Sequence, residues 1–315
     1  MAERRHLISI DDLSDDELRW IVERGVEYSR GTGGATQPLS GTVVGVLFRK
    51  TSTRTRTAFS AGALRLGAGL VTYGPADLQL ATGESVEDTG AVLSGMLDVL
   101  VARTAGPEAE LRAYAGQKQM SVINAMSAVE HPTQALADLT TIVQHFGRVE
   151  GVRVLYVGEG NNTASALTLA LSRYPGTELH LRTPAGYGVE QRYLDQAAAS
   201  ARRSGARVEQ RHDLSGLPPV DVVYTTRWQT TGSTKPTPHW RSEFAPFQVN
   251  EALMAAAPDA VFMHDLPAHR GEEVTAAVLD GPRSIAFTQA ENKYHSARAV
   301  LEWCVASRPS GGAGR

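Results

Sequence analysis

The stretch Ser52-Thr53-Arg54-Thr55-Arg56 combines hydroxyl donors with forked cations, a composition suited to binding a small anion. It follows an apolar run, 42–48, that is predicted to be a strand, and a helix is predicted to begin within it. A helix start presents unpaired backbone N–H groups and the positive end of the helix dipole. With Arg49 and Lys50, four cations lie between positions 49 and 56, and an anion among them would relieve their mutual repulsion. The sequence therefore predicts an anion site of phosphate size here; a solvated basic turn capped by Ser and Thr is the alternative.

Two further places put polar groups where a reaction could use them. Arg103 ends the apolar run 97–102, a predicted buried strand, and a charge there needs a partner, either a bound anion or a capping ion pair. His131 and Gln134 lie at the predicted start of a helix, with Pro132 tolerated in its first turn. An imidazole and an amide at that position can hold a carbonyl oxygen that gains negative charge, although a lone histidine is more often structural.

Several segments, in the same order along the chain, resemble motifs of the aspartate and ornithine carbamoyltransferases. After Ser52 to Arg56 these are Gly83-Glu84-Ser85 with Asp88-Thr89, Arg103, His131-Pro132-Thr133-Gln134, Gly158-Glu159-Gly160-Asn161-Asn162, His264-Asp265-Leu266-Pro267 and Glu291-Asn292-Lys293. The ornithine branch is favoured over the aspartate branch, because two more segments are similar to segments of the ornithine enzymes: Thr183-Pro184-Ala185-Gly186-Tyr187 and Ala268-His269-Arg270-Gly271-Glu272-Glu273.

The resemblance implies transfer of a carbamoyl group from carbamoyl phosphate to an amine of ornithine or an ornithine-like acceptor, with release of phosphate. A non-catalytic member of the family, binding a small anion or a partner protein, is the alternative. Donors on the phosphate favour its departure, and donors on the carbonyl oxygen strengthen as charge develops there. By this resemblance, carbamoyl phosphate would be held by Ser52, Thr53, Arg54, Thr55, Arg103, His131, Gln134, the backbone carbonyl of Leu266, and Lys293.

Catalysis is expected, again from the resemblance, to depend on Arg54, Arg103, His131, Gln134 and Asp265, with His131 neutral or protonated. The reaction requires neither a metal nor an organic cofactor, and the sequence shows no His, Cys and Asp cluster with ligand spacing. Lys293 stands where the family usually has an arginine. Because an ammonium cannot form the planar fork of a guanidinium, we expect weaker binding of carbamoyl phosphate than in an arginine-bearing relative.

The acceptor site departs from the family's ornithine pattern. Ornithine enzymes carry an Asp where this chain has Thr226, Ser-Met-Gly where it has Thr230-Thr231-Gly232, and a Cys where it has Asp265. Asp265 adds a negative charge near the attacking nitrogen, which favours a more cationic acceptor or supplies a proton acceptor. Either the acceptor is another amine, such as a diamine or a modified ornithine, or one carboxylate has moved and ornithine is still bound. The expected acceptor ligands are Asn162, Thr226, Thr230, Thr231 and Asp265.

Length and composition agree with a two-domain enzyme. The chain has 315 residues, of which 42% are hydrophobic, and its formal net charge of −3 argues against a nucleic-acid partner. The single cysteine, Cys304, excludes an internal disulfide framework. No apolar run reaches transmembrane length and no signal peptide is recognised, so we expect no membrane association and a cytoplasmic location.

Alternating strand and helix patterns predict an α/β fold with two domains, each a mainly parallel sheet flanked by helices. Residues 1–147 are expected to form the carbamoyl-phosphate-binding domain and 148–290 the acceptor-binding domain, with the catalytic cleft between them. A C-terminal helix, 292–305, within the segment 291–308, is expected to pack back on the first domain. Strands of the second domain are predicted near 152–157, 178–182, 207–211, 220–225, 260–264 and 284–287. The turn at 158–163 resembles a dinucleotide fingerprint, but Thr163 replaces its third glycine, so a nicotinamide enzyme is rejected.

A long polar segment, 74–84, separates a predicted strand from the next helix. In the resembling family this segment reaches into a neighbouring subunit's active site, so Gln79 and Thr82 would act in trans in a homotrimer. An ordinary surface loop is the alternative.

Overall fold

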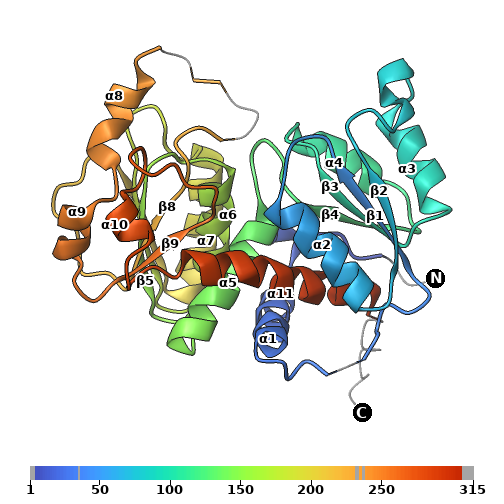
Figure 1. The fold of residues 1–315 in the computed structure, drawn as a ribbon, viewed down its shortest axis with the longest axis horizontal. Coiled ribbons are helices and arrows are strands. Elements are labelled where there is room, and N and C mark those ends of the chain that lie inside the picture. Colours follow the sequence, from blue (N-terminus) through green and yellow to red (C-terminus); the bar gives the residue numbers. More distant parts are fainter. Residues whose placement is uncertain (1–3, 35, 231–233, 236–237, 307–315) are drawn as a thin grey trace. The chain divides into compact units, whose positions relative to one another are not determined.

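The computed structural model describes residues 4–34, 36–230, 234–235 and 238–306, which divide into two compact units. Unit 1 comprises Met1–Ser127 with Tyr294–Arg315, and unit 2 comprises Ala128–Lys293. Each unit contains one parallel sheet with helices packed on it, which confirms the predicted α/β class (Figure 1). Among the described residues, no helix combines the length and the apolar character needed to cross a membrane.

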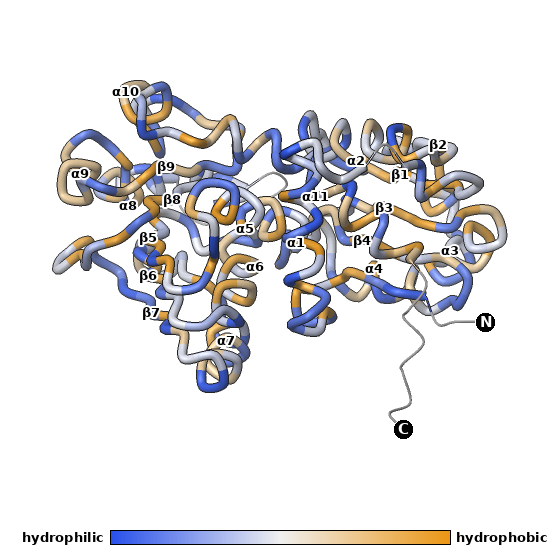
Figure 2. The backbone as a smooth tube through the Cα atoms, turned by 90° about the horizontal axis from the view of Figure 1, so that it is seen from below, coloured by the Kyte–Doolittle hydropathy of each residue, from blue (hydrophilic) through white to orange (hydrophobic). Residues whose placement is uncertain are grey.

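The sheet of unit 1 has four described strands in the order β2-β1-β3-β4. β3 is buried along its whole length and is coloured largely hydrophobic in Figure 2, as expected for a central parallel strand. α2 packs on β1 and β2, while α4 packs on β4 and against α3. The elements of unit 1 are, in chain order, the 3₁₀ turn η1 (Ile10–Asp12), α1 (Asp15–Ser29), β1 (Val43–Phe48), α2 (Arg54–Arg65), β2 (Gly69–Tyr73), the 3₁₀ turn η2 (Gln79–Thr82), α3 (Val86–Ser94), β3 (Val99–Arg103), α4 (Glu108–Ala115) and β4 (Ser121–Asn124).

The sheet of unit 2 has five described strands in the order β7-β6-β5-β8-β9, all parallel. α5, α6 and α7 pack in sequence beside one another, with α6 on β6 and α7 on β7. The carboxyl ends of β5, β8 and β9 lie next to one another in the sheet, so the loops that follow them emerge at one edge. The elements of unit 2 are α5 (Pro132–Phe146), β5 (Arg153–Val157), α6 (Asn162–Leu171), β6 (Glu178–Arg182), α7 (Gln191–Ser204), β7 (Arg207–Arg211), β8 (Val222–Thr225), α8 (Trp240–Phe244), the 3₁₀ turn η3 (Ala245–Phe247), α9 (Glu251–Ala256), β9 (Val261–His264), α10 (Ala276–Leu279) and the start of α11 (Ala286–Val305).

The predicted strand at 284–287 is wrong. Ser284 forms only an isolated bridge with Phe262: the N–H of Phe262 donates to the carbonyl of Arg283, and the N–H of Ile285 donates to the carbonyl of Phe262. α11 already begins at Ala286. The β-branched Ile285 suggested a strand, but the residues after it are good helix formers and the ladder stops. The C-terminal helix is therefore six residues longer at its start than the predicted 292–305.

The last part of α11 belongs to unit 1, as the expectation of a returning C-terminal helix requires. Glu302 accepts a hydrogen bond from Arg24 Nε at 2.8 Å and one from the hydroxyl of Tyr28 at 2.5 Å. Arg5 donates to the backbone carbonyl of Trp303 at 2.9 Å. α5 groups with unit 2, although the sequence pattern placed it before the boundary at 147; the domain limits themselves stay a prediction.

Candidate functional site

The anion loop, Ser52 to Arg56, joins the end of β1 to the start of α2 in unit 1. Thr53 is the N-cap of α2, and its hydroxyl makes no capping bond to the first-turn N–H groups. Thr55 is buried, whereas Thr53 and Arg56 are exposed and Ser52 and Arg54 are half-buried. The loop thus presents backbone donors, hydroxyls and guanidinium groups around one helix start, as the sequence predicts.

Arg103 reaches the anion loop from the neighbouring strand. β3 lies beside β1 in a register that pairs Arg103 with Phe48, which is the last residue of β1 and lies four positions before Ser52. The guanidinium Nη1 of Arg103 donates to the hydroxyl of Ser52 at 3.3 Å, and its side chain is largely buried. The structure therefore brings Arg103 together with the anion loop, although the two are far apart in sequence.

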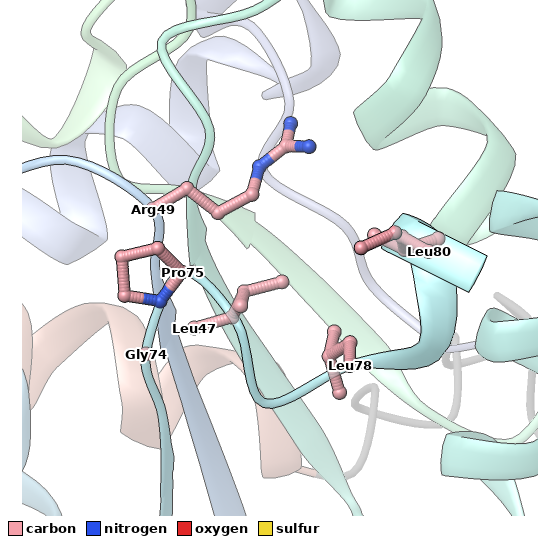
Figure 3. Close-up of a pocket in the computed structure, with 7 residues that line it drawn as sticks. Leu47, Arg49, Gly74, Pro75, Leu78 and Leu80 are labelled. Carbon is pink, nitrogen blue, oxygen red and sulfur yellow. The ribbon is translucent and has the colours of Figure 1, made fainter. Parts of the chain in front are cut away.

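Arg49 does not contribute its charge to the anion loop, since its guanidinium pairs with the carboxylate of Glu110. It borders a cavity of about 260 Å³ beneath the segment 74–84, whose wall is otherwise mainly apolar (Figure 3). Gln79 and Thr82 are exposed in η2, and the Thr82 hydroxyl donates to the Gln79 side chain at 2.8 Å. The cavity is lined by Leu47, Arg49, Gly74, Pro75, Leu78, Leu80 and Ala81.

His131 and Gln134 lie at the start of α5 in unit 2, as predicted. His131 is the N-cap residue and Pro132 occupies the first turn. The backbone N–H of His131 donates to the carbonyl of Asn162 at 3.1 Å, which ties the start of α5 to the start of α6. His131 Nδ1 lies 3.3 Å from the hydroxyl of Thr133, and the side chains of His131 and Gln134 are buried.

Asp138 lies one helical turn after Gln134 and is fully buried. Its carboxylate accepts from Gln134 Nε2 and Gln289 Nε2, both at 2.7 Å, and from the Tyr224 hydroxyl at 3.0 Å. Burial raises the pKa of the Asp138 carboxyl from 3.8 to about 7, against the lowering effect of the two amide bonds and of the Lys293 charge. Lys293, predicted at the carbamoyl phosphate site, donates to the side-chain oxygen of Gln134.

The acceptor turn, Gly158 to Asn162, follows β5. Gly160 is required there, because a Cβ atom would come within 2.1 Å of the backbone nitrogen of Val189. Asn161 caps α6 by accepting from the backbone N–H groups of Thr163 and Ala164 at 3.0 and 3.2 Å, and its amide donates to Thr230 at 2.9 Å. Asn162 begins α6 and is buried.

Asp265 and Thr226, two of the departures from the ornithine pattern, are hydrogen-bonded to each other. The Thr226 hydroxyl donates to Asp265 at 2.9 Å, and the Thr163 hydroxyl donates to its other oxygen at 3.0 Å. Within the described residues, no Lys or Arg nitrogen lies within ion-pair distance of this carboxylate, whose side chain is 15% exposed. Among the residues that the structure describes, Asp265 is thus an oriented anion without a Lys or Arg partner, and its nearest basic atom is His264 Nδ1 at 3.5 Å. Thr231, also predicted as an acceptor ligand, lies outside the described residues.

A second carboxylate at this edge, Glu159, is neutralised by a lysine that the sequence reading did not single out. The ammonium of Lys235 pairs with Glu159, and its side chain is 3% exposed. Ring centroids of Phe244, Tyr187 and Trp240 lie 4.8, 5.1 and 5.6 Å from that ammonium. Burial lowers the pKa of Lys235, and Glu159 opposes this shift. Glu159 also accepts from the Thr230 hydroxyl at 3.1 Å.

Leu266 has a left-handed backbone, with φ of 51°, followed by a cis bond to Pro267. His264 supports it: the backbone N–H of Leu266 donates to His264 Nδ1 at 2.8 Å. Because Nδ1 accepts, Nε2 carries the proton and donates to Glu273 at 3.1 Å. The backbone N–H of Leu266, a residue whose carbonyl is predicted as a carbamoyl ligand, is therefore held by a histidine of fixed tautomer.

Among the described residues, one group of three side chains, a histidine and two glutamates, could ligate a metal ion. His269, Glu272 and Glu273 bring one ligand atom each within 4.8 Å of one another. Glu273 already accepts from His264, and Arg241 lies 3.5 Å from Glu272. We assign no metal to this group.

The sequence reading missed Asp138, Glu159, Thr163 and Lys235 as members of these sites. A usable signal existed for Asp138, a charged residue on the apolar face of α5 at four positions from Gln134, which requires buried partners. No local signal marks Lys235, because its partner Glu159 lies 76 positions away.

Comparison with known proteins gives a consistent picture over nearly the whole chain. Residues 5–144 match the model of the carbamoyl-P binding domain of aspartate/ornithine carbamoyltransferase, and residues 150–304 match the model of its Asp/Orn binding domain. An ornithine carbamoyltransferase of Nitrosococcus oceani is 39% identical over 307 residues, covering 96% of this chain and 98% of the relative. The solved ornithine carbamoyltransferase of Pyrococcus furiosus is 37% identical with a TM-score of 0.89, covering 96% of this chain and 97% of that one. The enzyme from Gloeobacter violaceus is 35% identical with a TM-score of 0.86, covering 97% and 100%.

Proposed function

The chain belongs to the aspartate/ornithine carbamoyltransferase family, and from this premise we propose that it transfers the carbamoyl group of carbamoyl phosphate to an amine of ornithine or of an ornithine-like acceptor. The observation that carries the proposal is the anion loop with Arg103 bonded to Ser52. A loop of this composition at a helix start binds a phosphoryl group without any metal.

The reaction forms one bond and breaks one bond. The lone pair of the neutral acceptor amine attacks the carbamoyl carbon, and the resulting tetrahedral species expels phosphate by breaking the bond between that carbon and the bridging oxygen. The amine proton leaves with the departing phosphate. In this scheme Ser52, Thr53, Arg54, Thr55 and Arg103 stabilise the phosphate charge, each charged hydrogen bond contributing about 1.5–3 kcal/mol.

The carbonyl oxygen gains negative charge in the tetrahedral species and needs donors. Thr55, Arg103 and His131 supply them in our proposal, and such donors act most strongly on the developing charge. The carbamoyl NH₂ group needs acceptors, for which we propose the side-chain oxygen of Gln134 and the backbone carbonyl of Leu266. Lys293 supplies a positive charge beside Gln134, to which it already donates.

The acceptor amine is assigned to the edge of unit 2 at which Asn162, Thr226, Thr230 and Asp265 lie. Asp265 has no Lys or Arg partner among the described residues, so it can receive a cationic group of the acceptor. Thr226 holds this carboxylate, which supports the reading that one carboxylate has moved from the first acceptor motif to the second. Thr231 is retained as a proposed ligand from the sequence alone.

The experiment that tests this function is a phosphate-release assay with carbamoyl phosphate and a panel of amines. The panel holds ornithine, hydroxylated and guanidino analogues of ornithine, and linear diamines, and mass spectrometry identifies the carbamoylated product. We expect turnover with ornithine or one of its analogues. Phosphate release no faster than spontaneous hydrolysis with every amine would contradict the proposal and favour the non-catalytic alternative.

We also propose that the chain assembles as a homotrimer, in which Gln79 and Thr82 act on a neighbouring subunit's substrate. Their exposure in η2 supports this role. Sedimentation velocity should give a single species of three chains, and a fully active monomer would contradict the proposal. The cytoplasmic location stays a prediction from sequence.

A further inference from the structure

We propose that one glutamate and three aromatic side chains beside the acceptor turn form a binding pocket for an alkylammonium ion, and that Lys235 fills this pocket in the present chain. The four side chains are those of Glu159, Tyr187, Trp240 and Phe244. A free ion of the same shape should therefore occupy the pocket once the lysine side chain is removed. The role of this ion in catalysis rests on the proposed function, which assigns Thr230 to the acceptor, whereas the pocket itself does not depend on it.

The walls of this pocket hold one another without the lysine. Phe244 is fully buried and packs edge-on against Tyr187 and Trp240, with ring centroids 4.8 and 5.6 Å apart. Tyr187 is also tied to the acceptor turn, because the backbone N–H of Gly160 donates to its carbonyl at 2.8 Å. Glu159 precedes Gly160 in the same turn. The pocket should therefore keep its shape when the lysine side chain is absent.

The interior of the pocket suits a cation better than a neutral group. The ammonium of Lys235 lies over all three rings and pairs with Glu159. The face of an aromatic ring carries negative charge density, so the rings and the carboxylate all attract a positive ion. Burial lowers the pKa of this ammonium, and Glu159 is the group that opposes the shift. A hydroxyl or methyl group in the same place would gain little from the three ring faces.

The length of the ion follows from the lysine that now fills the pocket. The Lys235 side chain is 3% exposed, so its alkyl chain is enclosed together with its ammonium. Substitution by alanine removes every side-chain atom beyond Cβ, and these atoms have the composition of n-propylammonium. That ion therefore replaces the deleted atoms one for one. Propan-1-ol has the same length with a hydroxyl in place of the ammonium, and it supplies the neutral comparison.

The ion is connected to the acceptor turn through Glu159. One oxygen of this carboxylate receives the ammonium, and the other accepts from the Thr230 hydroxyl at 3.1 Å. The Thr230 oxygen in turn accepts from the amide of Asn161 at 2.9 Å, the residue that caps α6. Without a cation, Glu159 is a largely buried carboxylate beside ring faces, and it gains solvation by turning outward, away from Thr230. A cation in the pocket therefore positions Thr230.

The binding test uses Lys235→Ala, with Lys235→Met as the matched control, because a methionine side chain fills the pocket and carries no charge. n-Propylammonium chloride is added at constant ionic strength, without carbamoyl phosphate. Fluorescence reports on the pocket, since Trp228 and Trp240, two of the chain's four tryptophans, belong to this aromatic cluster. We expect a saturable change of emission and a higher unfolding temperature in Lys235→Ala, and neither in the wild type, in Lys235→Met or with propan-1-ol. An ion bound at Asp265 would affect all three proteins alike.

The kinetic test measures the KM of the acceptor in the same three proteins. Lys235→Ala should raise this KM about tenfold, the effect of one hydrogen bond to a charged group, and n-propylammonium should return it to within about twofold of the wild type. The KM of Lys235→Met should stay high with and without the ion. Mass spectrometry counts carbamoylated propylamine separately. A wild type without turnover would defeat the proposed function and leave the binding test intact, whereas binding without recovery of KM would overturn the positioning of Thr230.

A measurement on the wild type guards against misfolding of Lys235→Ala. Acetic anhydride labels lysine side chains, and the exposed Lys118 is the internal reference. Lys235 should be labelled more slowly than Lys118 by about tenfold or more in the folded chain, and at the same rate in the denatured chain. Glu159→Gln removes the negative charge with little change of shape and should weaken this protection. Equal labelling of both lysines in the folded wild type would overturn the proposal. So would a folded Lys235→Ala on which n-propylammonium has no saturable effect.

Discussion

The anion loop of unit 1 and the acceptor turn of unit 2 are two charged sites built in different ways. The anion loop takes most of its donors from five neighbouring positions, and Arg103 joins them because β3 lies beside β1 in the sheet. The residues around the acceptor turn come from the segments that follow three different strands. Asp265 bonds Thr226 and Thr163, from which it is separated by 39 and 102 residues. Glu159 is paired with Lys235 across 76 residues.

This difference has a chemical counterpart. The anion loop offers positive charge and hydrogen-bond donors, which suit a phosphoryl group. Beside the acceptor turn, Lys235 neutralises Glu159, whereas Asp265 has no Lys or Arg partner among the described residues. We infer that the anion loop fixes which donor molecule is used, and that the pairing of charges around the acceptor turn fixes which amine is used. Four variants test whether the anion loop and the acceptor site act separately in this way.

The largest effect is expected from Arg54→Ala in the anion loop. Loss of two charged hydrogen bonds of about 1.5–3 kcal/mol each should lower kcat/KM for carbamoyl phosphate by about 10²- to 10⁴-fold. Because Arg54 is half-buried at a helix start and fills no core, the thermal unfolding curve should be unchanged. Arg65→Ala, which removes an exposed arginine at the other end of α2, is the matched control and should keep activity. Near-normal turnover in Arg54→Ala would contradict the assignment of the anion loop.

The double variant Thr226→Asp/Asp265→Cys should change the preferred acceptor and leave the donor site alone. Returning the carboxylate to position 226 should raise the preference for ornithine over the best wild-type amine by about ten- to a hundredfold, the worth of one charged hydrogen bond. The KM for carbamoyl phosphate should stay the same. Competition assays with paired amines measure the ratio. If the wild type already prefers ornithine to every other amine, the hypothesis of a different acceptor is wrong. The alternative, in which one carboxylate has moved and ornithine is still bound, then remains.

Lys235→Met removes the ammonium and keeps an apolar side chain against the three rings. Glu159 then lacks its counter-charge, which should disturb its bond to Thr230 and raise the KM for the acceptor by about tenfold, equivalent to one hydrogen bond to a charged group. Arg241→Met is the matched control, because Arg241 also lies over Trp240, at 4.5 Å, but is exposed. An equal effect of both variants, or a raised KM for carbamoyl phosphate, would contradict the proposal that the acceptor site acts separately from the anion loop.

The smallest effect is expected from Lys293→Arg. A guanidinium can contact both Gln134 and a carbamoyl phosphate oxygen, where the ammonium of lysine is a single point charge. The KM for carbamoyl phosphate should fall by about three- to tenfold, the worth of a partly solvated hydrogen bond. Initial-rate measurements at saturating acceptor give this value. An unchanged or higher KM would show that Lys293 is better suited to the Gln134 contact than to the substrate.

The contrast between the locally built anion loop and the acceptor site, whose residues come from distant segments, also explains what the sequence could and could not predict. The α/β class, the strand ends and the helix starts at Arg54 and Pro132 follow from apolar periodicity and local turn chemistry, and the structure confirms them. Lys235 was missed because its partner Glu159 comes from a distant segment, whereas Asp138 was missed although its place on the apolar face of α5 was a usable signal. The strand predicted at 284–287 is wrong: Ile285 has strand propensity, but the segment forms only an isolated bridge with Phe262, and α11 begins at Ala286.

The composition of unit 1 from the two ends of the chain has a consequence for synthesis. Arg24 and Tyr28 of α1 bond Glu302, which is 278 residues downstream of Arg24, so unit 1 cannot complete these contacts until α11 has been synthesised. Unit 2 is continuous from Ala128 to Lys293 and lacks this constraint. Contacts of such sequence separation slow folding, and a nascent chain stopped before α11 would expose the partners of Glu302. The C-terminal part of α11 therefore completes the unit that carries the anion loop only after unit 2 has been synthesised.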